Sequence, residues 1–185
     1  MPYVKETHRN KLDPLLQIVS DELAASATSL VKPQQIGQIY FSTFLDISRS
    51  VKDLASGNEF RSASKSSQGV AKAIFEASAE DGSFWAGDLN YSLTRIIQIV
   101  PKILVEEKKW DKEFRYWTYA VTAGALERTA LAITQESSIK KEQDWLDVVL
   151  VGVLLDIKDE YKRRVNVPYE EEQKKINGDC YDVKI

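Results

Sequence analysis

Apolar residues recur every three to four positions along most of the chain, which is the spacing of an amphipathic helix. The clearest case follows Pro33 and ends before Gly57-Asn58. Its apolar and aromatic members are Ile36, Ile39, Tyr40, Phe44, Ile47, Val51 and Leu54. Proline in the first turn and glycine after the last turn are typical helix boundaries. This stretch therefore predicts a long helix with one buried face.

The same reasoning predicts a helix before this one. Asp13-Pro14 places a capping residue before a proline at the first helical position, and apolar residues at helical spacing continue to about Ser26. Residues 1–12 are mostly polar and are expected to form a loose N-terminal arm.

Three more helices are predicted in the middle of the chain. The third carries Val70, Ile74 and Ala77 and ends before Asp81-Gly82. The fourth begins at Asp88 as its cap, and Pro101 is expected to kink or end it because proline lacks a backbone donor. The fifth begins at Asp111, with apolar residues at helical spacing after it.

The sixth predicted helix begins between Ser138 and Lys141 and reaches about Arg164. Between Trp145 and Leu155 it is apolar nearly all round, which predicts burial on more than one side, inside the domain or at a subunit contact. A proline at position 168 then begins a short helix, so residues 166–185 are expected to form a C-terminal helix and tail.

No stretch alternates apolar and polar residues over the length of a strand. The chain of 185 residues suits one domain, and we predict an all-α bundle of six or seven helices that spans residues 1–185. The first residues lack the apolar segment of a signal peptide, and the longest apolar run, Val148 to Leu155, is too short to cross a bilayer. A cytoplasmic protein is expected.

The sequence has few of the residues that several common kinds of catalytic and metal site require. The only histidine is His8, and the only cysteine is Cys180, so nucleophilic triads and nitrogen or sulfur metal sites are not expected. No glycine-rich phosphate loop or dinucleotide motif occurs. The formal net charge of −3 argues against general nucleic-acid binding. No cofactor is predicted.

Two polar clusters nevertheless suit an anionic ligand, at Gly87 to Arg95 and at Tyr161 to Tyr181. Free N–H groups at a helix start attract anions, and guanidinium groups bind carboxylate or phosphate through paired donors. The candidate ligand-binding residues are Asp88, Asn90, Tyr91, Arg95, Arg163, Arg164 and Tyr169. The arginines would bind the anion, the aspartate and asparagine would form hydrogen bonds with polar groups of the ligand, and a tyrosine would stack on the ligand.

A structural role for the same residues is the alternative. The two arginines of the second cluster would pair with Glu170 to Glu172, while Asp88 and Asn90 would cap helices. In that arrangement the polar clusters tie the C-terminal tail to the bundle.

These clusters also carry a family resemblance. The motifs GDLNY with a following threonine and arginine, then GVL, EYKRR, PYEEE and NGDCY, lie within Gly87 to Arg95 and Gly152 to Tyr181. They resemble an uncharacterised family of short helical proteins of bacteria and their phages. Leu155 stands where that pattern has an acid, and Lys162 stands where it often has tyrosine. The resemblance implies a bacterial or phage origin and no specific activity.

The sequence favours a non-catalytic helical binding protein, expected to be a homo-oligomer, for a partner or a small nucleotide-like anion. A phage protein that sequesters a host nucleotide fits this description. One alternative is a magnesium-dependent nucleotide hydrolase, for which the helix-borne acids are Asp144, Asp147, Asp156, Asp159 and Glu160. Asp156 is expected to be partly buried beside Arg128 or Arg163. A structural or adaptor protein is the other alternative.

Overall fold

Helices account for every regular element in the computed structural model, which describes residues 4–27, 33–61, 63–107, 114–140 and 144–177. In chain order they are α1 (Glu6–Ser26), α2 (Pro33–Ala55), α3 (Lys65–Asp81), α4 (Ala86–Glu106), α5 (Phe114–Lys140), α6 (Trp145–Tyr161), the π-helical turn η1 (Lys162–Asn166) and α7 (Val167–Asn177). The prediction of an all-α fold is confirmed.

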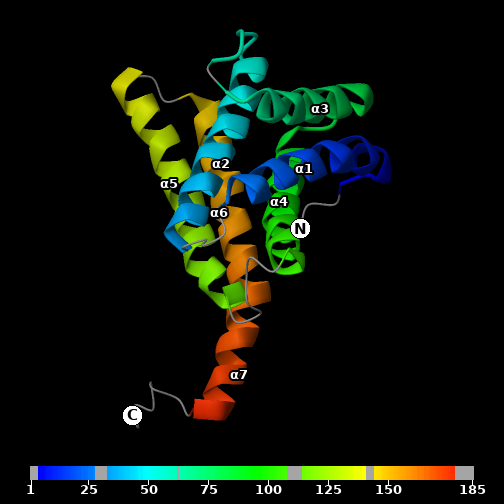
Figure 1. The fold of residues 1–185 in the computed structure, drawn as a ribbon. Coiled ribbons are helices and arrows are strands. Elements are labelled where there is room, and N and C mark those ends of the chain that lie inside the picture. Colours follow the sequence, from blue (N-terminus) through cyan, green and yellow to red (C-terminus); the bar gives the residue numbers. More distant parts are fainter. Residues whose placement is uncertain (1–3, 28–32, 62, 108–113, 141–143, 178–185) are drawn as a thin grey trace.

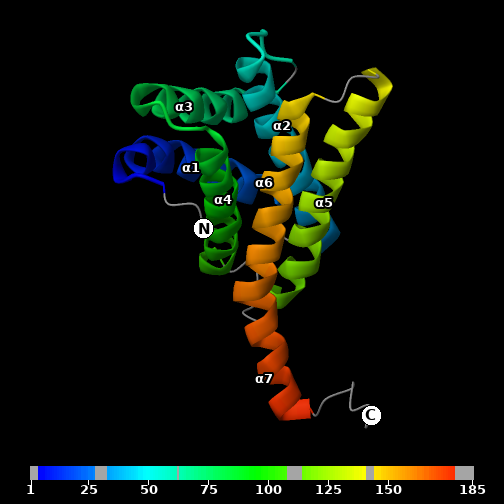
Figure 2. The same cartoon turned by 180° about the vertical axis from the view of Figure 1, so that it is seen from behind.

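Three long helices form one side of the bundle, with α2 packed against α5 and α5 packed against α6. On its other side α6 packs against α4 (Figure 2). The helices α1 and α3 cross the bundle and pack against each other, and α1 also covers α4 (Figure 1). In both views α7 continues the line of α6 and extends away from the bundle.

The core is built from the apolar stripes that the sequence pattern indicates. Its largest fully buried side chains are Tyr40, Phe44, Leu12, Leu16, Ile36, Ile47, Ile74, Leu89, Leu93, Ile96, Leu104 and Leu126. They come from α1 to α5, so these five helices share one core, to which α6 adds Leu146, Leu150 and Leu154. Removing these side chains from water supplies most of the favourable free energy of folding.

Several helix boundaries agree with the local sequence. The helix α2 begins at Pro33, and Gly57 follows its last turn with a φ of 70°. Gly82, with a φ of 67°, ends α3 in the left-handed conformation that glycine adopts without a Cβ clash. The Ser64 hydroxyl oxygen accepts a hydrogen bond from the Ser67 backbone N–H and caps the start of α3.

The first helix is longer than expected. It begins at Glu6 instead of Pro14, so residues 6–12 are helical where the sequence predicted a loose arm. His8 and Leu12 are buried, and Pro14 lies inside the helix. The packing of these two side chains offsets the backbone hydrogen bond that proline removes.

The fourth helix also passes through its proline. It begins at Ala86, includes Asp88 in its first turn, and continues beyond Pro101 to Glu106. Ile99, Val100 and Leu104 are buried around the proline, so tertiary packing holds this turn helical.

The predicted boundaries of the last helices need correction. The start expected between Ser138 and Lys141 is wrong, because α5 continues to Lys140 and α6 begins at Trp145, capped by Asp144. The expectation that a separate helix begins at Pro168 is also wrong. The chain stays helical from α6 through η1 into α7. Proline cannot donate to the carbonyl four residues earlier, and the π-helical turn ends two residues before Pro168. The expected cap Asp111 and the tail residues 178–185 lie outside the described residues.

No helix within the described ranges has both the length and the apolar character that a membrane span requires.

The shared core leads to a stability prediction. Leu93→Ala removes a side chain that is 0% exposed and should lower the free energy of unfolding by about 2–5 kcal/mol, because it leaves a cavity. The matched variant Leu131→Ala changes a side chain that is 55% exposed and should cost about 0.5 kcal/mol or less. Urea denaturation followed by circular dichroism measures both values. Equal losses would contradict the assignment of the core.

Candidate functional site

A buried polar cluster lies where α1, α3 and α4 meet. The Nδ1 atom of His8 lies 3.0 Å from an Asp88 carboxylate oxygen, and Nε2 lies 3.0 Å from Asp81. The Ser78 hydroxyl donates to Asp88 at 3.0 Å. His8, Asp88 and Ser78 are all buried. The aspartate that the sequence placed in a ligand site therefore accepts hydrogen bonds from two neighbouring helices.

Both imidazole nitrogens of His8 lie beside carboxylate oxygens, and which nitrogen donates depends on the tautomer. Each nitrogen faces a carboxylate oxygen, which only accepts, and a neutral imidazole has a single N–H to donate. On its outer side Asp81 also accepts from Lys5 at 2.6 Å and from the backbone N–H of Ser83. The Lys5 hydrogen bond is the main reason that the pKa of Asp81 lies well below its usual range. The cluster fastens α1 to α3 and α4.

Three further candidate residues on α4 also make internal contacts. The Asn90 amide donates to Asp156 on α6 at 2.7 Å, and the Tyr91 hydroxyl donates to Asp13 on α1 at 2.7 Å. Burial and the Asp13 contact raise the pKa of Tyr91 to about 12. Arg95 lies 3.6 Å from the same Asp13 carboxylate. These contacts join α4 to its neighbours and occupy the groups expected to read a ligand.

The remaining candidates belong to the path from α6 into α7. Arg163 and Arg164 both donate to Glu160, at 2.9 Å and 2.8 Å for Arg163. The hydrogen bonds from Arg163 and then from Arg164 lower the pKa of Glu160 to about 2. Tyr169 lies in α7, one turn beyond η1. In the described residues the partner of these arginines is Glu160 rather than the predicted Glu170 to Glu172.

The first predicted cluster contacts α6 at a residue that precedes the second cluster. Asn90 bonds to Asp156, which precedes Glu160 by four residues on the same side of α6. The Asn90 amide and the two arginines already donate to carboxylates of α6. An anionic ligand would have to compete with these carboxylates for the same donors. The ligand-binding role of these residues stays a prediction.

Four of the five acids proposed for magnesium binding contact other side chains, and two of them, Asp144 and Asp147, share Lys52. Asp144 caps α6, Asp147 is buried against Lys52, and Glu160 holds the two arginines. Asp156 is exposed and bonds to Asn90, so the expected burial beside Arg128 or Arg163 is wrong. Within the described ranges no three histidine, cysteine or acidic side chains gather as a metal site would require.

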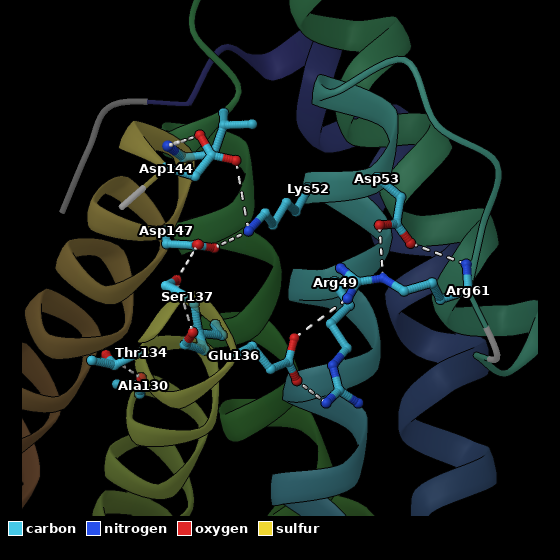
Figure 3. Close-up of polar contacts among 12 residues, drawn as sticks. Arg49, Lys52, Asp53, Arg61, Ala130, Thr134, Glu136, Ser137, Asp144 and Asp147 are labelled. Carbon is cyan, nitrogen blue, oxygen red and sulfur yellow. Dashed lines mark hydrogen bonds and ion pairs between the residues drawn. The ribbon is translucent and has the colours of Figure 1, made fainter. Parts of the chain in front are cut away.

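A second buried polar network lies between α2, α5 and α6 and was not predicted. Lys52 of α2 forms ion pairs with Asp147 and, at 3.6 Å, with Asp144 (Figure 3). Ser137 of α5 donates to the other oxygen of Asp147. The side chain of Asp147 is 6% exposed and that of Lys52 is 14% exposed. A buried pair of this kind strongly penalises loss of either partner.

The network continues along α2 toward the loop before α3. Arg49 and Arg61 both bind Glu136 of α5, and Arg61 also donates to Asp53 at 2.9 Å (Figure 3). Every cation in this group faces a carboxylate, so the group holds neighbouring helices together. The charged residues that interrupt the apolar stripe of α2 are visible in the sequence, but the partner of Arg49 lies 87 residues away on α5 and the partner of Lys52 lies 95 residues away on α6.

The outward side of α6 exposes large apolar side chains, which no contact within the described bundle explains. Trp145 is 60% exposed, Val148 is 55% exposed and Leu155 is 40% exposed. Figure 2 shows α6 facing the viewer between α4 and α5, with no helix covering it. Phe84, itself 51% exposed, stacks on Trp145 with ring centroids 6.1 Å apart. We call these four side chains the α6 apolar face.

The comparisons with known proteins give a family and no activity. A family model described as a domain of unknown function (DUF6899) matches residues 1–180. The chain belongs to this DUF6899 family. Neither the curated proteins nor the solved structures yielded a significant match. The expectation of an uncharacterised family is thus confirmed, and for this DUF6899 protein any functional argument rests on its own side chains.

The Lys52–Asp147 pair leads to a second stability prediction. Lys52→Met leaves the Asp147 carboxylate buried, with Ser137 as its one remaining partner among the described residues, and should cost about 3–5 kcal/mol of unfolding free energy. Lys11→Met breaks the exposed pair with Glu80 and should cost about 1 kcal/mol or less. Urea denaturation compares the two variants. The double variant Lys52→Met with Asp147→Leu should recover much of the loss, and a purely additive result would contradict a coupled buried pair.

The contacts of Glu160 can be tested by titration. In the wild-type protein its carboxyl group should titrate near pH 2, because the arginines stabilise the charged form. Arg163→Ala and Arg164→Ala should each raise this pKa toward the ordinary glutamate value, whereas Lys162→Ala should leave it unchanged. Carboxyl carbon NMR shifts recorded against pH give the values. An unshifted pKa in both arginine variants would remove Glu160 as their partner.

Proposed function

We propose that this protein is a non-catalytic helical binding protein and that its α6 apolar face docks a protein partner. The supporting observation is the exposure of Trp145, Val148 and Phe84, each more than half accessible. Large exposed apolar side chains that gather on one surface are typical of protein contact sites, and aromatic residues are enriched there.

The contacts that hold α6 in the bundle favour a docking role for its exposed residues. They argue against the alternative that α6 is exposed because it is loosely packed. Its inward residues Leu146, Leu150 and Leu154 are buried, and the Lys52–Asp147 pair fixes its first turn. We therefore expect the backbone that carries the exposed residues to be ordered before a partner binds. A rigid surface loses less conformational entropy on binding, which strengthens association.

The internal contacts of the polar residues also favour a protein partner. Asp88 and Asn90 are buried in hydrogen bonds, and Arg95 lies beside Asp13. A small anionic ligand, including a nucleotide sequestered by a phage protein, would have to displace Glu160 from Arg163 and Arg164. The motif resemblance adds a bacterial or phage origin to the proposal.

Site-specific photo-cross-linking tests the docking surface. A photoreactive amino acid at Val148 should give cross-linked protein products, while one at Leu131 on α5 should not, although both side chains are 55% exposed. Excess unlabelled wild-type protein should suppress the products, and excess Trp145→Ala should suppress them poorly because it lacks the most exposed aromatic side chain of the face. Gel electrophoresis measures the yields, and mass spectrometry identifies the attached chain.

Equal cross-linking from both positions would contradict the proposal, since it would show that exposure alone determines the products. Suppression by Trp145→Ala as effective as that by wild type would contradict it as well.

A further inference from the structure

Three of the four residues of the α6 apolar face lie on α6 and, with Gly152 and Asp159, follow one line of that helix. At about 100° per residue, positions 145, 148, 152, 155 and 159 fall on the side opposite the buried leucines. In this order they are Trp145, Val148, Gly152, Leu155 and Asp159. All five are exposed. The line has apolar side chains toward its start, a glycine at its centre and an acid at its far end.

Nothing in the described residues requires glycine at position 152. A Cβ atom built on it meets no atom within 4 Å, and its φ is not in the left-handed region that requires glycine. Glycine inside a helix costs about 1 kcal/mol relative to alanine, so this position gives up helix stability without an internal contact. What glycine does provide is a flat site where a second helix can approach the backbone closely.

We propose that the occupant of this face is the same helix of a second copy of the chain, crossing antiparallel with Gly152 at the two-fold axis. In a two-fold contact the residue on the axis meets itself, and residues at equal distances before and after it meet each other. Gly152 is the midpoint between Trp145 and Asp159. Val148 then packs near Leu155 of the second copy, and each glycine leaves room for the other.

Charge complementarity selects the antiparallel arrangement. A parallel pair would place Asp159 against Asp159, and like charges at a contact are destabilising. The antiparallel pair places Asp159 beside Trp145 of the second copy, at the start of α6. The helix N-terminus carries partial positive charge, and the indole N–H is a donor that a carboxylate can accept. Among the described residues no hydrogen bond or ion pair involves the Asp159 carboxylate, which leaves its oxygens for a donor of the second copy.

The dimer rests on the proposed docking function and names its partner. The contact is about 25 Å long because α6 has 17 residues at about 1.5 Å each. One helix pair with Phe84 at each end is a small interface, so we expect weak, concentration-dependent dimers of the kind that small interfaces support.

Disulfide trapping tests both the partner and the direction. In a Cys180→Ser background, Gly152→Cys should form a disulfide-linked dimer under mild oxidation, because residues on the axis lie within disulfide reach. Asp159→Cys alone should stay monomeric, and a mixture of Asp159→Cys with Trp145→Cys should form the mixed dimer. Non-reducing gel electrophoresis measures each product.

A companion variant separates dimer loss from unfolding. Gly152→Leu should raise the dimer dissociation constant about tenfold or more in sedimentation equilibrium, because the leucine blocks the crossing. It should leave the thermal unfolding temperature equal or higher, since leucine is a better helix former and the position is open. Gly69→Leu on α3, where the built Cβ is also free of contacts, is the matched control and should leave dimerisation unchanged.

Each contrary result has a defined meaning. Self-linked Asp159→Cys would overturn the antiparallel direction. A monomer at all concentrations, with no trapped Gly152→Cys, would overturn the second copy as partner. If cross-links from position 148 to a different protein persisted in that case, the docking function would stand, and if they were absent too, both proposals would fail.

Discussion

The buried carboxylate of Asp147 constrains how the three long helices meet. It lies on the inward side of α6, where Lys52 of α2 and Ser137 of α5 both direct hydrogen-bond donors at it. An acid at this depth is tolerable only with its donors in place, so the contact sets the rotation of α6 about its own axis. Once that rotation is set, Trp145, Val148 and Leu155 must face outward. The apolar face is thus exposed because the contacts of Asp147 set the orientation of α6, and not because α6 packs weakly.

The polar residues elsewhere serve the same purpose of holding helices together. His8 and Asp88 connect α1 to α4, Asn90 and Asp156 connect α4 to α6, and Glu136 connects α5 to α2. A bundle whose charges are largely paired internally has few of them left for a small ligand. What it leaves for recognition is apolar surface, and this is why we assign the protein a docking role.

The sequence predicted those features that depend on neighbouring residues. The glycines at 57 and 82 end α2 and α3, and Pro33 begins α2, because turn and cap geometry is local. The helix that passes through Pro14 was not predicted, since tertiary burial there outweighs a local penalty, and at Pro101 the prediction left open whether the helix kinks or ends. For the candidate site the difficulty was greater. Asp88 was recognised as a polar residue near a helix start, but its partner His8 lies 80 residues away in sequence, and no local pattern encodes that contact.

The excess apolar character of α6 was the most informative sequence signal, and it left open whether the helix is buried within the domain or at a subunit contact. The structure buries one side and exposes the other, so the account depends on the outward side being covered in solution. Hydroxyl-radical footprinting of the full-length protein over a range of concentrations measures this directly. The account predicts that Trp145 and Val148 become protected as concentration rises, while Leu131, equally exposed to solvent as Val148, stays reactive. Reactivity of Trp145 and Val148 that does not change with concentration, in parallel with Leu131, would contradict it.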